Sequence, residues 1–125
     1  MAKGKFKFYF LWLSVICAIA FILQLLIPGF TELFVLNIKA VILNEYWRFA
    51  SAVFLHGSTI HLLYNLFALL FFGFMLERLI GSKRFLIVFL TSGIVGNIIA
   101  VNFYENSLGV SGAVYGIIGC LTILN

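Results

Sequence analysis

Three polar residues in otherwise apolar surroundings have the types and spacing that catalytic chemistry needs. Ser111 lies between Gly109 and Gly112 in the run Gly-Val-Ser-Gly, and His61 and Asn65 are four residues apart. Residues i and i+4 share one face of a helix, so His61 and Asn65 are expected to point the same way. A serine hydroxyl is a nucleophile, and imidazole, amide and free backbone N–H groups can stabilise the oxyanion that its attack creates. The residues therefore predict half of an acyl-transfer site, with Ser111 as the nucleophile.

The same residues also have a purely structural interpretation. Gly112 and Gly116 are four residues apart, a spacing that is typical of close packing between membrane helices. A histidine or an asparagine inside a membrane bundle often serves only to hydrogen-bond one helix to another. From the residues alone, catalysis and helix packing both remain open.

The composition indicates what kind of protein must position these residues. Of the 125 residues 64% are hydrophobic, and only 8 are basic and 4 acidic. A soluble domain is about 45–50% apolar and about 25% charged, so a soluble globular domain and a disordered chain are both excluded. A bilayer-spanning helix needs about 20 apolar residues, which leaves room for about four spans. We therefore expect an all-α, polytopic transmembrane helical bundle.

Four apolar runs are the expected spans, at about residues 8–27, 59–76, 85–103 and 110–125. The first span stops at Pro28-Gly29, and Ser58 is a candidate N-cap for the second. The last run continues for only 15 residues from Ser111, or about 22 Å, whereas the hydrocarbon core is about 30 Å thick. We therefore interpret residues 1–125 as one incomplete domain that is cut within its fourth span.

The connection over residues 28–58 is too long and too apolar to be a free linker. It is expected to form short amphipathic structure in the membrane interface, with Tyr46 and Trp47 at headgroup depth.

Basic residues predict the orientation of the spans. Three basic residues precede the first span and three lie in the expected turn over 77–84, against two in the 28–58 connection. The positive-inside rule then places the N-terminus and that turn in the cytoplasm. His61, Asn65 and Ser111 would meet at similar depth in a site that opens to the outer side. The short N-terminus, without an Arg/Ser-rich transit segment, favours a prokaryotic plasma membrane.

Several other functions are excluded by what the sequence lacks. It has no aspartate, no His-Glu-x-x-His run and no Cys-x-x-Cys run, which argues against a two-aspartate protease and against a zinc site. We expect no metal and no cofactor. Nucleic-acid binding would need a basic face on a soluble module, so the expected partner of the basic residues is the lipid bilayer.

Four motifs in a fixed order carry a resemblance to a known family. They are Trp47-Arg48, His56-x4-His61-x3-Asn65, Glu77-Arg78-x2-Gly81-Ser82 and Gly109-x-Ser111-Gly112-x2-Tyr115, spread over residues 45–119. In this order and spacing the chain resembles the rhomboid intramembrane serine proteases. The resemblance implies a rhomboid-like bundle of six or more spans, of which about four are present here. It also implies hydrolysis of peptide bonds in or near transmembrane segments of membrane-protein substrates.

The resemblance implies roles for the residues of the site itself. Ser111 would be the nucleophile, and His61, Asn65 and the backbone N–H of Ser111 would form the oxyanion hole. His56 would be structural, near the mouth of the site. Tyr115 would stack beside the catalytic histidine.

Three further residues would have supporting roles by the same resemblance. Trp47 and Arg48 would belong to the membrane-embedded loop after the first span. Glu77 would cap and stabilise the cytoplasmic end of the second span.

The general base is where the chain departs from the family pattern. In rhomboids this histidine lies on the sixth helix of the core, and here both histidines, His56 and His61, already match other positions. Residues 1–125 alone are therefore predicted to be inactive. A non-catalytic rhomboid-like protein that binds membrane clients is the alternative, and an unrelated transporter or channel fragment is a third hypothesis.

Overall fold

The fold is a bundle of apolar helices, seen in a computed structural model that describes residues 5–124. Two residues used in the sequence analysis lie outside that range: Lys3, one of the basic residues before the first expected span, and Asn125, the last residue of the fourth. Three helices are long and apolar enough to cross a membrane: α1 (Tyr9–Leu26), the continuous helix Thr59–Ile80, and α7 (Ser82–Ala100). A fourth apolar helix, α8 (Ser111–Leu124), is shorter. The structure confirms the all-α membrane bundle that the composition predicts.

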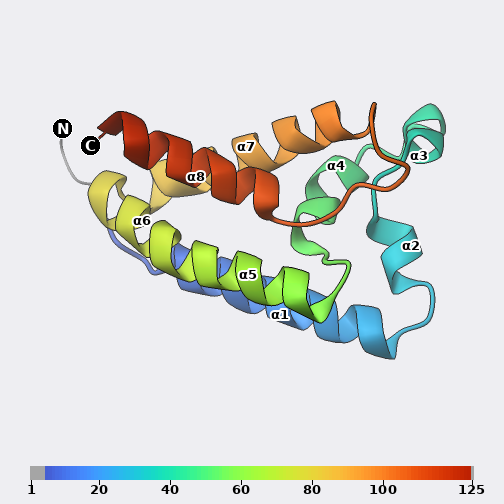
Figure 1. Cartoon of the computed structure of the whole chain (residues 1–125), viewed down its shortest axis with the longest axis horizontal. Coiled ribbons are helices and arrows are strands. Elements are labelled where there is room, and N and C mark those ends of the chain that lie inside the picture. Colours follow the sequence, from blue (N-terminus) through green and yellow to red (C-terminus); the bar gives the residue numbers. More distant parts are fainter. Residues whose placement is uncertain (1–4, 125) are drawn as a thin grey trace.

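The helices are arranged so that α8 lies beside α7, while α1 runs next to the Thr59–Ile80 helix (Figure 1). The start of α1, the end of the Thr59–Ile80 helix and the end of α8 lie at one end of the molecule. The connection after α1 lies at the other end. In Figure 1, α8 begins part-way along the long axis, inside the far ends of α1 and of the Thr59–Ile80 helix. The first residue of α8 is therefore set back from that end of the bundle.

Exposed apolar side chains cover the outside of α1. Trp12, Ile19 and Leu25 are all exposed on this helix. An apolar surface of this kind is unusual on a soluble monomer and is expected where a helix faces lipid.

The connection between α1 and the second long helix folds into short helices. They are α2 (Phe30–Phe34), α3 (Ile38–Ile42), α4 (Arg48–Ser51) and the 3₁₀ turn η1 (Ala52–Phe54). Leu36 and Ser107 exchange backbone hydrogen bonds of 3.1 and 2.7 Å across an isolated antiparallel bridge. The connection thereby holds the loop that leads into α8.

The second long helix has three parts: α5 (Thr59–Ala68), the π-helical segment η2 (Leu69–Gly73) and α6 (Phe74–Ile80). Ser58 caps its start, because the Ser58 hydroxyl accepts a hydrogen bond from the His61 N–H at 3.1 Å.

The turn that we expected over residues 77–84 is shorter in the structure. The helix continues to Ile80, and Gly81 alone separates it from α7, with a φ of 89° that favours glycine. The reason is burial: Glu77 is fully buried and Ile80 packs in the core, so both stay within the helix. At the other end of α7, the helix stops at Ala100 rather than at about residue 103.

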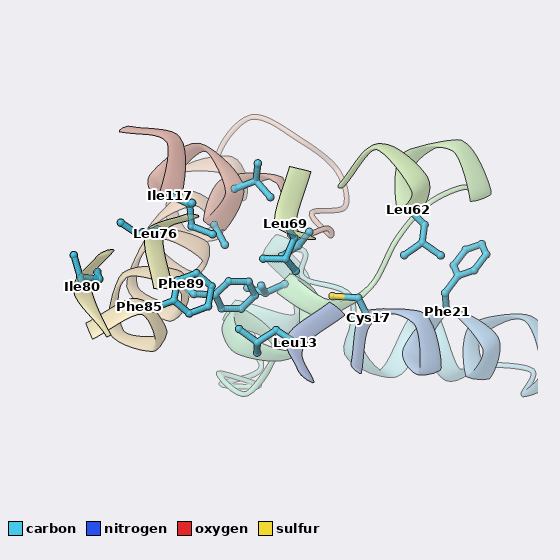
Figure 2. Packing of buried hydrophobic residues seen from close by; sticks show 14 residues of the cluster. Leu13, Cys17, Phe21, Leu62, Leu69, Leu76, Ile80, Phe85, Phe89 and Ile117 are labelled. Atoms are coloured by element: carbon cyan, nitrogen blue, oxygen red, sulfur yellow. The ribbon is translucent and has the colours of Figure 1, made fainter. Parts of the chain in front are cut away.

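The main core runs along the middle of the bundle (Figure 2). Phe85 and Phe89 of α7 are fully buried near Leu13 of α1 and Leu76 of α6, as Figure 2 shows. In lipid, contacts of this kind stabilise a bundle through close packing rather than through removal of apolar groups from water.

Candidate active site

Ser111 is the first residue of α8 and is half-buried. The first N–H groups of a helix have no partner within the helix, so the turn that Ser111 begins offers free backbone donors. The loop before Ser111 is anchored where the Gly109 N–H donates to the Ala52 carbonyl at 2.8 Å. Gly109 has a φ of 110°, a conformation that an L side chain rarely adopts, and this directs the chain into α8.

His61 lies directly against Gly109, two residues before Ser111. A methyl group on Gly109 would lie 2.9 Å from His61 Cε1 and 3.4 Å from His61 Nε2. Both the backbone conformation and the ring therefore require glycine at position 109. This contact unites the first turn of α5 with the start of α8, although 48 residues separate them in sequence.

His56 packs against the His61 ring. The His56 and His61 rings meet edge to face, with centroids 5.3 Å apart. His56 is buried, and neither of its ring nitrogens has a hydrogen-bond partner among residues 5–124. Burial, with a smaller contribution from His61, lowers the pKa of His56 from 6.5 to about 4. The nearby Phe54 carbonyl opposes this shift without reaching good hydrogen-bond geometry. His56 is therefore neutral at pH 7.

Asn65 is buried one turn after His61 on the same face of α5. Its side-chain Nδ2 has no hydrogen-bond partner among the described residues. A buried donor without a partner is costly, and it remains available to an incoming acceptor. Asn65 and His61 thus offer hydrogen-bond donors from α5, a helix that touches α8.

Gly112 and Gly116 face α7 rather than the histidines. A methyl group on Gly112 would lie 3.5 Å from the Ser92 carbonyl oxygen, and one on Gly116 would overlap the Ser92 side chain. These two glycines have the close-packing role that their spacing allows. Tyr115 lies one turn after Ser111 and is exposed on α8.

Arg48 organises the connection after α1. Its guanidinium group donates to the carbonyls of Glu32 and Val35, at 2.6 and 2.9 Å, and pairs with the Glu45 carboxylate at 2.7 Å. It also lies 5.7 Å from the centre of the exposed Trp47 ring. Arg48 and Trp47 therefore make these contacts within the connection.

Glu77 lies at the opposite end of the molecule from the connection. Its carboxylate accepts hydrogen bonds from the N–H groups of Tyr9 and Phe10, both at 2.7 Å, and from the Ser82 hydroxyl at 2.5 Å. The Glu77 carboxylate thus caps the start of α1 and also holds Ser82, which follows the end of its own helix.

Polar residues that the sequence reasoning missed hold the loops around the site. Asn97 of α7 donates to the Phe49 carbonyl at 2.9 Å and accepts from the Ser107 hydroxyl at 2.9 Å. Gln24 of α1 bonds to the backbone of His56. Both interrupt apolar spans, and a polar residue at membrane depth is the signal that could have identified them.

A pocket of about 470 Å³ opens beside His56. Gln24, Thr31 and Thr59 supply polar groups to it, and Phe21 and Leu108 are among its apolar walls. Among residues 5–124, no three histidine, cysteine or glutamate side chains gather as a metal ion would need.

Comparison with known proteins adds independent findings. The sequence model of the Rhomboid domain matches residues 43–125. RHOMBOID-like protein 4 of Arabidopsis thaliana is 41% identical over 87 residues, which are 67% of this chain and 22% of that protein. Rhomboid protease GluP of Bacillus subtilis (strain 168) is 40% identical over 79 residues, 62% of this chain and 16% of that protein.

Another relative is named as inactive. Inactive RHOMBOID-like protein 8 of Arabidopsis thaliana is 36% identical over 80 residues, 62% of this chain and 23% of that protein. The matched part of this chain thus spans less than a quarter of the length of each of these three relatives.

Proposed function

This chain belongs to the rhomboid family, and from that membership we propose that it carries the nucleophile half of an intramembrane serine protease. The observation that carries the proposal is the contact between His61 and Gly109, beside Ser111. It joins a candidate nucleophile to candidate oxyanion donors from a distant helix. Helix packing alone would not need an imidazole at this position.

The proposed chemistry is acyl transfer. The Ser111 Oγ attacks the carbonyl carbon of the scissile peptide, and a general base takes the hydroxyl proton. His61, Asn65 and the Ser111 N–H donate hydrogen bonds to the oxyanion. The C–N bond then breaks, the protonated base gives its proton to the amine, and water hydrolyses the acyl-enzyme. Neutral donors suit a site at membrane depth, where a permanent charge is costly.

The general base of this proposal is a histidine outside residues 1–125. In this proposal His61 donates to the oxyanion, and His56 packs against the His61 ring with a pKa of about 4, too low for a base near neutral pH. We therefore propose that residues 1–125 alone do not cleave peptides.

The proposed substrates are transmembrane segments of other membrane proteins. Lys5, Lys7 and Arg78 lie near the end where α1 begins, which we assign to the cytoplasm of a prokaryotic plasma membrane. The site at the start of α8 then opens to the outer side. Water must reach it from there, because hydrolysis of the acyl-enzyme consumes a water molecule.

Non-catalytic binding of membrane clients is the second candidate function. In the proposed site His61 donates to the oxyanion and the His56 ring packs against His61, so neither serves as the base, and a site without a base could still bind a client. The retained Ser111 between its glycines favours the protease.

The test compares residues 1–125 with a longer protein in which a histidine-bearing helix follows them. Both are reconstituted in lipid vesicles with a single-span substrate and, separately, with a fluorophosphonate probe. The longer protein is expected to cleave the substrate and to label at Ser111, and residues 1–125 are expected to do neither. Ser111→Ala in the longer protein is the control.

Two results would contradict the proposal. Cleavage that survives Ser111→Ala would exclude Ser111 as the nucleophile, and Ser111-dependent cleavage by residues 1–125 alone would exclude an external base. A folded longer protein that binds the substrate without cleaving or labelling would support the client-binding function instead.

A further inference from the structure

Gln24 forms a two-point contact with the backbone of His56. The His56 N–H donates to Gln24 Oε1 at 3.0 Å, and Gln24 Nε2 donates to the His56 carbonyl at 2.9 Å. The Gln24 amide thereby satisfies both the N–H and the carbonyl of the His56 backbone, as a residue on a neighbouring β-strand would. Gln24 Nε2 also lies 3.1 Å from Thr31 Oγ1. These bonds link α1 to the segment that enters α5, 32 residues further along the chain.

Within residues 5–124 the His56 side chain has no hydrogen bond to fix it. Both ring nitrogens lack a partner among the described residues, so the ring is held by packing and by the position of its backbone. That backbone position is the one that Gln24 fixes. Gly57 and Ser58 follow at once, and both are exposed.

Contacts then pass from His56 to the start of α8. The His56 ring meets the His61 ring at 5.3 Å, and His61 lies against Gly109. Movement of His56 would remove the surface against which His61 packs. The His61 ring could then leave Gly109, because its own backbone bond to Ser58 restrains only the N–H.

The cost of placing glutamine in this helix supports a specific role. Gln24 interrupts a run of apolar residues in α1, and an amide in a membrane span is unfavourable unless it is hydrogen-bonded. The Gln24 side chain forms its hydrogen bonds with Thr31 and His56, both in the connection beside the candidate site.

We propose that Gln24 is a positioning residue of the candidate active site: it fixes the His56 backbone, and His56 in turn holds the His61 ring against Gly109. The importance of Gln24 for catalysis rests on the proposed function. The contacts from Gln24 to His56, and from His56 to His61, do not depend on that function and can be tested without measuring activity.

The test is Gln24→Met in residues 1–125 reconstituted in lipid nanodiscs. Methionine keeps the length of the side chain and removes both hydrogen bonds to the His56 backbone, together with the bond to Thr31. NMR signals of the two histidine rings are recorded, with His56→Gln used to assign them. We expect both ring signals to move beyond their linewidths, and diethyl pyrocarbonate to modify His56, which is protected in the unchanged chain by burial.

Three matched variants separate positioning from general destabilisation. Gln24→Glu retains the acceptor for the His56 N–H and loses the donor, so an intermediate shift is expected. Thr31→Val removes only the third bond of Gln24 and should leave both histidines nearly unchanged. Ser14→Ala removes a hydroxyl on α1 that bonds to the Phe10 carbonyl at 2.8 Å, and it should not move either histidine signal.

Unchanged histidine signals in folded Gln24→Met would overturn the proposal, and so would equal shifts in Ser14→Ala. If Gln24→Met does not fold, Gln24→Glu decides by the same comparison. The outcome is independent of proteolysis. Shifted histidine signals in residues 1–125, together with a Ser111 that stays unreactive in the longer protein, would leave Gln24 as a positioning residue and refute the protease instead.

Discussion

Gly116 of α8 lies against the side chain of Ser92 of α7 so closely that no methyl group fits between them. Gly119, one turn further along α8, has open space at the position of its Cβ, with no packing neighbour among the described residues within 4 Å. Two glycines on one helix thus have opposite packing requirements. They provide a matched pair of substitutions for the interface between α7 and α8.

Gly116→Ala is expected to destabilise the bundle by about 1–3 kcal/mol, because the added methyl group must push α7 and α8 apart. Gly119→Ala should be neutral or stabilise the bundle by up to about 1 kcal/mol, since alanine favours the helix. Unfolding in mixed micelles measures both. Ser92→Gly should restore much of the stability of Gly116→Ala, and a double variant that is no better than Gly116→Ala would contradict the assigned clash.

Ser111→Ala should abolish covalent labelling by a fluorophosphonate and lower peptide cleavage by at least about 10⁴-fold in the longer protein described above. The cause is loss of the attacking oxygen, with the bundle otherwise intact. The unfolding midpoint should therefore stay close to that of the unchanged protein. A large drop in stability would point instead to a packing role for the hydroxyl.

His61→Ala and Asn65→Ala should each lower kcat by about 10²–10³-fold in the longer protein, with little change in KM, because each removes one donor to the oxyanion. Initial rates over a range of substrate concentrations separate the two constants. A rise in KM at constant kcat would assign these side chains to substrate binding rather than to the transition state.

Glu77→Ala is expected to cost at least about 3 kcal/mol of stability, because the N–H groups of Tyr9 and Phe10 and the Ser82 hydroxyl lose their buried acceptor. Glu105, which is exposed, gives the matched control. Glu105→Ala should change stability by less than about 0.5 kcal/mol. Equal effects of the two substitutions in micelle unfolding would show that Glu77 does not hold the start of α1.

Acid should destabilise the fold through His56. Its pKa falls from 6.5 to about 4 in the folded chain, so the unfolded chain takes up the proton first as the pH is lowered. The stability that comes from a neutral His56 is present above about pH 6.5 and is lost as the pH falls toward about 4. Unfolding of the unchanged chain and of His56→Gln is compared across this range. The unchanged chain should lose more stability, and parallel pH curves would contradict the role of His56.

The sequence by itself determined the class of protein and the main helices. Its apolar content leaves few polar groups to face water, and only helices satisfy their backbone groups within a single span in lipid. The runs of apolar residues therefore located α1, the Thr59–Ile80 helix, α7 and α8 to within a few residues. The order of the polar motifs also indicated the family, which the match over residues 43–125 confirms.

The end of the second helix was harder to predict, for a physical reason. Glu77 and Arg78 look like the residues of a charged turn, because an isolated carboxylate is costly inside a bundle. The structure buries Glu77 within the helix because the start of α1 supplies its donors. That compensation comes from residues almost 70 positions away, which local sequence does not reveal.

Topology predicted that His61, Asn65 and Ser111 gather at one depth, but tertiary structure alone decided the individual contacts around them. The spacing of His61 and Asn65 predicts a shared helix face, but it says nothing of Gly109, whose contact with His61 depends on how α5 and α8 pack. The two hydrogen bonds between Gln24 and the His56 backbone cannot be predicted from the sequence either, because Gln24 lies in an apolar run outside the four motifs. Periodicity in a sequence reports the environment of one helix, whereas contacts between helices depend on the depth and rotation that the whole bundle adopts.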